Sequence, residues 1–255
     1  MNYFFSIKTD KLKSKLTIPK FQNCGKKIKK NKVYKACIKN NTWNVSDPVF
    51  DQNNNFYFID SSELNNENIF FLATEKELVK MKNTNFSKLD NISEFTDTFP
   101  DYRANLRLFN SEGGFSSYQS EYPHTMTEKK GSILSPISIL LNKHNDENIL
   151  FFKNIHCCPE NKKFEIYFLN IVNKKIISNK TVYTNKTNII NIDKDLINPD
   201  VYLFSKEYLG IPIFLSIKNG HMSLEHTHPP HLYILGSERY KKVMELKKEI
   251  LNVID

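Results

Sequence analysis

Arginine and glycine are scarce in this sequence, and long apolar runs are missing. Only three of the 255 residues are arginine, and only seven are glycine. No apolar run approaches the roughly 18 residues of a membrane-spanning helix. No glycine-rich loop joins a strand to a helix, so a doubly wound nucleotide-binding fold is not expected. The first residues, Met1–Lys11, lack the pattern of a secretory signal. We therefore expect a cytoplasmic protein without a membrane span.

Cysteine is also rare, and its spacing excludes the common cysteine frameworks. The four cysteines form no CxxC pair, and Cys157 and Cys158 are adjacent, a spacing awkward for a disulfide or for metal ligation. We expect reduced thiols, as is usual in the cytoplasm. An alternative is that Cys157 or Cys158 is a nucleophile activated by the neighbouring His156.

Positive charge exceeds negative charge, with 36 Lys and Arg residues against 28 Asp and Glu residues and a net charge of +8. Such a balance suggests nucleic acid or acidic surfaces as partners. The basic residues are mainly lysines scattered among asparagines, however, and no nucleic-acid-binding motif is present. We therefore expect a generic basic surface, with a nucleic-acid-binding protein as a weaker alternative. Where a chain otherwise uses lysine, an arginine indicates a position that needs a planar guanidinium group.

The pattern of apolar residues predicts a mainly β protein, with an α+β fold as the alternative. Thr74–Glu77 resembles a capping box that begins a short helix near residues 75–82, and apolar spacing predicts a C-terminal helix near 237–253. Short apolar segments bounded by polar turns predict strands at 33–38, 43–45, 56–59, 69–72, 164–172, 175–183, 188–192 and 201–204.

Strands at this spacing, without βαβ alternation, favour an antiparallel β-sandwich or barrel-like sheets closed by the C-terminal helix. A polar stretch over residues 83–100 is the predicted boundary between an N-terminal and a C-terminal part. We therefore expect a mostly-β N-terminal part over residues 1–95 and a sandwich-like domain with the terminal helix over residues 96–255.

Two of the three arginines lie in a segment that alternates cleanly, 102–109, and a turn at 110–114 returns the chain through 115–122. If Phe109 pairs with Phe115, then Arg107 lies opposite Ser117. In the same register Asn105 lies opposite Gln119, and Arg103 lies opposite Glu121.

This register places arginines, amides, a hydroxyl and a carboxylate on one face of the hairpin. One interpretation is a solvent-facing polar surface with an ordinary Arg103–Glu121 pair. The other is a ligand-binding surface, because Arg103, Arg107, Asn105 and Gln119 offer directional hydrogen bonds to sugars, carboxylates or phosphates. His124 follows directly and is a further candidate for substrate binding.

Three of the seven histidines fall within six residues, at positions 226, 228 and 231. They follow Asn219-Gly220, which is the preferred dipeptide of a type I′ hairpin turn. A two-residue turn places Ile213 opposite His226 and Ile211 opposite His228. Both histidines then lie on the apolar face of the hairpin, whereas His231 follows two prolines.

Three interpretations of this cluster remain open. His226 and His228 can be structural residues bonded to backbone or carboxylate groups. With His231 they can instead bind a divalent metal, Zn or Fe(II), and keep an open position for substrate. They can also act without metal, as binding or acid–base groups.

The leading functional hypothesis is an enzyme for a small polar or anionic substrate, plausibly derived from a sugar. His226 and His228 would be catalytic or metal-binding, and Glu121 would be a general base or the partner of Arg103. Arg103, Arg107, Asn105, Gln119 and His124 would bind the substrate. The alternative is a non-catalytic β-sandwich module that binds a glycan or a protein.

Overall fold

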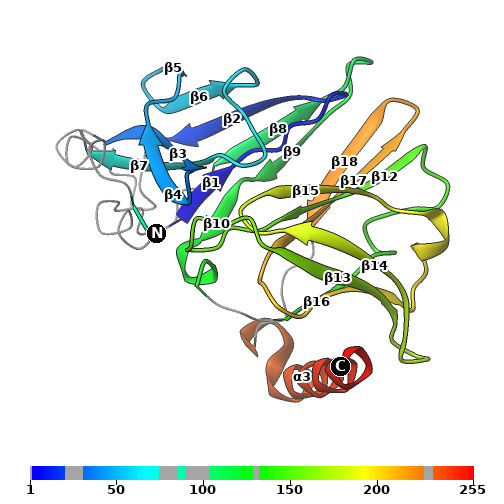
Figure 1. The fold of residues 1–255 in the computed structure, drawn as a ribbon. Helices are drawn as coiled ribbons and strands as arrows, with labels where there is room; N and C mark the ends of the chain where they lie inside the picture. The colour runs from blue at the N-terminus through cyan, green and yellow to red at the C-terminus, as the bar shows by residue number, and fades with distance from the viewer. Residues whose placement is uncertain (1, 21–30, 75–85, 90–103, 129–131, 227–231) are drawn as a thin grey trace.

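The structure, a computed structural model, describes residues 2–20, 31–74, 86–89, 104–128, 132–226 and 232–255. These residues form four small antiparallel sheets arranged like the blades of a four-bladed propeller (Figure 1). The mainly β prediction is confirmed, whereas the sandwich or barrel is not. The predicted short helix near 75–82 lies outside the described residues.

The first two sheets are formed by strands that lie between Asn2 and Pro123. Sheet A has, in spatial order, β10 (Glu121–Pro123), β1 (Asn2–Phe5), β7 (Ile69–Thr74), β3 (Asn31–Lys39) and β4 (Thr42–Ser46). Sheet B has β5 (Asp51–Gln52), β6 (Phe56–Asp60), β2 (Lys13–Pro19), β8 (Asn105–Phe109) and β9 (Phe115–Gln119).

The other two sheets are formed by later residues. Sheet C has β15 (Thr187–Asn191), β12 (Glu147–Lys153), β17 (Ile211–Lys218) and β18 (His221–His226). Sheet D has β11 (Ile133–Pro136), β16 (Val201–Ser205), β13 (Lys163–Asn170) and β14 (Lys175–Tyr183). A short 3-10 helix, η1 (His124–Met126), follows β10, and a second, η2 (Lys194–Leu196), lies between β15 and β16.

The two central strands of sheet C, β12 and β17, are apolar on both faces, which explains their continuous apolar runs. In β12, Ile149 and Phe151 face one hydrophobic core, whereas Leu150 and Phe152 face another. In β17, Ile213 and Leu215 belong to the first core and Phe214 to the second. The first core also includes the inner faces of sheets A and B, and the second is shared with sheet D. Sheet C therefore separates the two cores.

The predicted C-terminal helix is confirmed as α3 (Leu232–Ile254). Gly236 has a φ of 72°, so the helix is interrupted at this residue. Its later turns pack on sheet D, where Ile250 lies with Leu169 and Phe204 in a small third core. Within the described part of the chain, the helical segments are too short or too polar to cross a membrane.

The strand pairing shows where the chain leaves the first two sheets. β8 pairs with β2, and β10 pairs with β1, although both strands follow the predicted boundary near residue 95. The change to sheets C and D comes after Pro123. The division into two domains at residues 95 and 96 stays a prediction.

The two predicted hairpins meet at their turns. The Asn110 side-chain amide donates a hydrogen bond of 2.7 Å to the Gly220 carbonyl oxygen. A Cβ atom on Gly114 would overlap that same oxygen, and one on Gly220 would overlap the Glu112 carboxylate. The glycines therefore allow the two turns to approach each other closely.

We expect Gly114→Ala to lower the free energy of unfolding by about 2–3 kcal/mol, because the new methyl group meets backbone that cannot move aside. Gly113→Asn is the control, since Gly113 has open space and a φ of +88°, which asparagine tolerates. Urea denaturation measures both. Equal stability of Gly114→Ala and wild type would contradict the close packing of the turns.

Candidate functional site

The predicted register of the arginine hairpin is confirmed. Phe109 pairs with Phe115, Arg107 with Ser117, and Asn105 with Gln119. Arg107 and Gln119 are exposed, and Arg107 Nε donates to Asn105 Oδ1 at 3.2 Å. The alternating residues Ala104, Leu106 and Leu108 are buried. The polar side chains therefore lie on the outer face of sheet B.

β8 lies between β9 and β2, so this outer face continues across the sheet. Lys15 of β2 is the partner of Arg107 on one side and of Asp60 on the other. We define the open face as the outward residues of β2, β6, β8 and β9 around this row. They are Lys13, Lys15, Phe58, Asp60, Asn105, Arg107, Phe109, Phe115, Ser117 and Gln119.

Aromatic rings lie among the polar groups of the open face. Phe109 and Phe115 are neighbours with ring centroids 6.2 Å apart, and Phe115 is 63% exposed. Phe58 lies 5.1 Å below the Lys15 ammonium group, a cation–π distance. The open face thus combines exposed apolar surface with cations and amides.

The charges of the open face are unequal. The Lys15 ammonium group lies 3.7 Å from the Asp60 carboxylate. Lys13 of β2 is the cross-strand neighbour of Phe109, and Arg107 of β8 lies across Lys15 from Asp60. The part of the open face around Phe109, on β2 and β8, therefore carries two cations and none of the acidic residues of the open face.

His226 lies on the other side of β9. The predicted pairing of Ile213 with His226 is confirmed, and the imidazole packs edge-on against the Tyr118 ring at 4.9 Å. Tyr118 is buried and alternates with Ser117 and Gln119 of the open face. Burial, together with the nearby Glu121 and Glu225 carboxylates, raises the pKa of the Tyr118 hydroxyl well above its usual range. This tyrosine therefore remains neutral.

Glu121 and His124 also lie away from the open face. The Glu121 carboxylate accepts a hydrogen bond of 3.0 Å from the Ala104 backbone N–H. The His124 ring is half-buried, 6.1 Å from the ring of Tyr3 in the first core. Arg103, His228 and His231 lie outside the described residues.

The structure separates three of the predicted substrate-binding residues from the described catalytic candidates, whereas His124 lies away from the open face. Arg107, Asn105 and Gln119 lie on the open face, whereas His226 and Glu121 lie near Tyr118 on the opposite side of β9. Where the hairpin turns meet, a groove of about 500 Å³ is lined by Asp10–Leu12, Asn110–Glu112, Asp146, Glu147, Ile217, Asn219 and Gly220. None of the predicted site residues that the structure describes lines this groove. The enzyme hypothesis stays a prediction.

The scan against protein-family models, the search of curated proteins and the search of solved structures gave no match.

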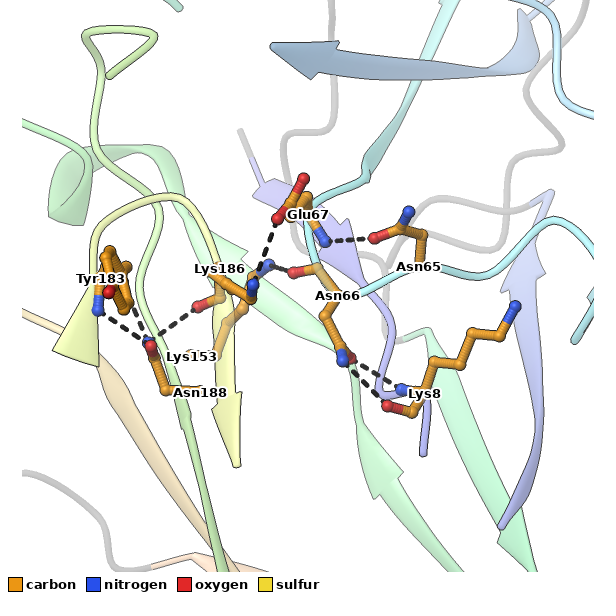
Figure 2. A network of polar contacts seen from close by, with 8 residues as sticks. All are labelled: Lys8, Asn65, Asn66, Glu67, Lys153, Tyr183, Lys186 and Asn188. Carbon is orange, nitrogen blue, oxygen red and sulfur yellow. Dashed lines mark hydrogen bonds and ion pairs between the residues drawn. The ribbon is translucent and has the colours of Figure 1, made fainter. Parts of the chain in front are cut away.

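A buried lysine, which the sequence reasoning did not single out, lies where sheet C meets the first two sheets. Lys153 ends β12 and is fully buried, and its ammonium group donates to the Asn66 carbonyl oxygen at 3.1 Å. The Asn66 side chain also exchanges two hydrogen bonds of 2.8 Å with the Lys8 backbone (Figure 2). The polar position directly after the Ile149–Phe152 run is the signal that could have identified Lys153.

The surroundings of Lys153 disfavour its charged form. Burial lowers the pKa of Lys153 to about 7, and the nearby Glu67 carboxylate offsets only part of this effect. Glu67 is itself 3.3 Å from the Lys186 ammonium group (Figure 2). Lys153 is shielded from solvent and links sheet C to the loop that contains Asn66.

The lowered pKa makes stability depend on pH in a defined window. In the unfolded chain Lys153 binds a proton up to its ordinary pKa near 10.5, whereas the folded protein releases it near pH 7. The free energy of unfolding should therefore rise with pH between these values, by about 1.4 kcal/mol per unit from this group. Below pH 7 both states bind the proton, so this slope disappears and the free energy of unfolding stays at its lower value.

We expect Lys153→Met to remove this slope, whereas the exposed control Lys143→Met should keep it. Urea denaturation at pH 7, 8 and 9 measures the difference between each variant and wild type. Parallel pH profiles for wild type and Lys153→Met would contradict a neutral buried amine.

Proposed function

We propose that the chain is a non-catalytic binding module whose open face binds an acidic surface of a protein partner. The observation that supports this proposal most is the pair of the exposed Phe115 and the half-buried Phe109, which lies beside Arg107 on an ordered sheet. Single exposed apolar residues are common on protein surfaces and need no explanation. Here two rings adjoin an arginine, in a chain that has only three arginines.

This composition is typical of protein interfaces. Aromatic residues and arginine are enriched in interfaces, and they account for many of the residues that dominate binding energy. Because Arg107 and Phe115 project from the sheet surface, they suit insertion into a complementary surface better than enclosure of a small ligand. A protein partner is therefore favoured over a small molecule.

The charge of the open face favours an acidic partner. Lys15 has an acidic neighbour in Asp60, whereas Lys13 and Arg107 lie near the Phe109–Phe115 pair. A carboxylate can accept two hydrogen bonds from one guanidinium group. Opposite charges across an interface also speed association at low ionic strength.

The backbone of the open face is ordered in advance of binding. β8 has hydrogen-bonded neighbours on both sides, and its inner residues Leu106 and Leu108 are buried in the first core. A partner would therefore need to order few side chains and no backbone. Such preorganisation raises affinity without additional contacts.

Two substitutions on the open face test the proposal. Phe115→Ser and Arg107→Glu should each weaken binding about tenfold or more, the loss of roughly 1.4 kcal/mol expected at a central interface position. Val172→Ser is the control for the first variant, because Val172 is 66% exposed. Lys175→Glu of β14 is the control for the second.

Partner proteins are first captured on the immobilised wild-type chain from an extract of cells that naturally produce it. Each captured protein is then identified and purified. Calorimetry of each purified partner with the four variants gives the dissociation constants, and the controls should match wild type within about a factor of two. The wild-type dissociation constant should also rise with salt. Binding of all four variants with wild-type affinity would contradict the proposal. Binding of a glycan, and not of a protein, at Phe115 would contradict it as well.

A further inference from the structure

Three consecutive side chains away from the open face bring metal-binding atoms together. His156, Cys157 and Cys158 each offer one ligand atom, and these atoms lie within 4.8 Å of one another. The segment follows β12 and Ile155, and all three side chains are buried or half-buried. Adjacent cysteines are an unfavourable pattern for a metal site, so only the geometry identifies this group.

The distance between the two sulfurs agrees with shared coordination of one ion. Cys157 Sγ and Cys158 Sγ lie 3.8 Å apart. Two thiolates bound to a tetrahedral zinc ion at about 2.3 Å would have sulfurs about 3.8 Å apart. A disulfide would instead need about 2.05 Å, and neither cysteine forms one.

The backbone of this segment is fixed by residues from other parts of the chain. The Cys157 carbonyl oxygen accepts hydrogen bonds from the Trp43 indole at 2.8 Å and from the Leu89 N–H at 3.0 Å. The Asn185 amide donates to the Cys158 carbonyl oxygen at 2.8 Å, and its oxygen accepts from the His156 N–H at 2.7 Å. These bonds hold the backbone of His156, Cys157 and Cys158 in place.

One ring nitrogen of His156 is held by a backbone carbonyl group. Its Nδ1 atom lies 3.1 Å from the Thr127 carbonyl oxygen, which can only accept a hydrogen bond. The ring is therefore protonated at Nδ1, and Nε2 is the nitrogen with a lone pair. A backbone carbonyl that orients a histidine in this way is a common feature of metal sites.

We propose that His156, Cys157 and Cys158 bind one zinc ion through an imidazole nitrogen and two thiolates. Each thiol loses its proton to solvent as its zinc–sulfur bond forms, so two thiolates and Zn²⁺ give a neutral centre. Two soft sulfurs with one imidazole select zinc over magnesium or calcium.

Cys158 also lines a surface cavity of about 470 Å³ with Pro159, Glu160 and Lys162. Three protein ligands beside this opening leave a fourth position for water or an added ligand.

Cobalt substitution in the reduced full-length protein tests this site. One equivalent of Co²⁺ should produce a thiolate-to-cobalt charge-transfer absorption, and one equivalent of Zn²⁺ should remove it. Cys158→Ser and His156→Ala should weaken Co²⁺ binding by at least about 100-fold, more than the loss of an outer-sphere partner causes. Cys37→Ser and His144→Ala are matched controls, and both should bind as wild type does.

Circular dichroism of each variant shows whether it is folded, and Cys158→Ser is the more conservative change. Absence of the charge-transfer band in the reduced wild type would overturn the proposal. Wild-type binding by folded Cys158→Ser and His156→Ala would overturn it as well. Loss of the band in both variants, with the band retained in both controls, would support it.

Discussion

The burial of both faces of β12 and β17, the central strands of sheet C, is the constraint on which the rest of the structure depends. Alternate residues of β12 and β17 enter two different cores, so each strand binds two layers of the protein at once. Phe152 and Phe214 hold sheet D on one side, while Phe151 and Ile213 hold the first two sheets on the other. Full burial of one such side chain contributes about 1.5–3 kcal/mol. Loss of sheet C would therefore expose both cores.

This arrangement also determines which surfaces remain available for binding. Sheet B directs Leu16, Leu106 and Leu108 into the first core, so the alternating residues of the same strands must face outward. The inward side of β9 is occupied by Tyr118, against which His226 of sheet C packs. Arg107 and its neighbours are consequently left on the open face, where no other described sheet covers them.

Local sequence patterns were sufficient to predict the two hairpins. Asn219-Gly220 determined the pairing of β17 with β18, and the alternation in residues 104–109 determined that of β8 with β9. The order of strands within the sheets was not predictable in this way. β8 and β10 join β2 and β1, which are about a hundred residues earlier in the chain, and such pairing depends on packing and not on local propensity.

The relation between the candidate sites was not predictable either. Each hairpin taken alone presents a polar or histidine-bearing face, but only the packing of β9 beside β18 shows that these faces point apart. Similarly, adjacency of Cys157 and Cys158 argues against a metal site until the sulfur separation is known. Lys153 was overlooked because its burial follows from contact with Asn66, a residue from a distant loop.

The central claim is that the open face, and not another surface, contacts a partner. Site-specific photo-crosslinking tests it most directly, with the crosslinking residue placed at exposed Ser117 of β9 or at exposed Thr181 of β14. Irradiation in an extract of the producing cells should give one major adduct, with an acidic protein, from position 117 and none from position 181. No adduct from position 117, or the same adducts from both positions, would contradict the account.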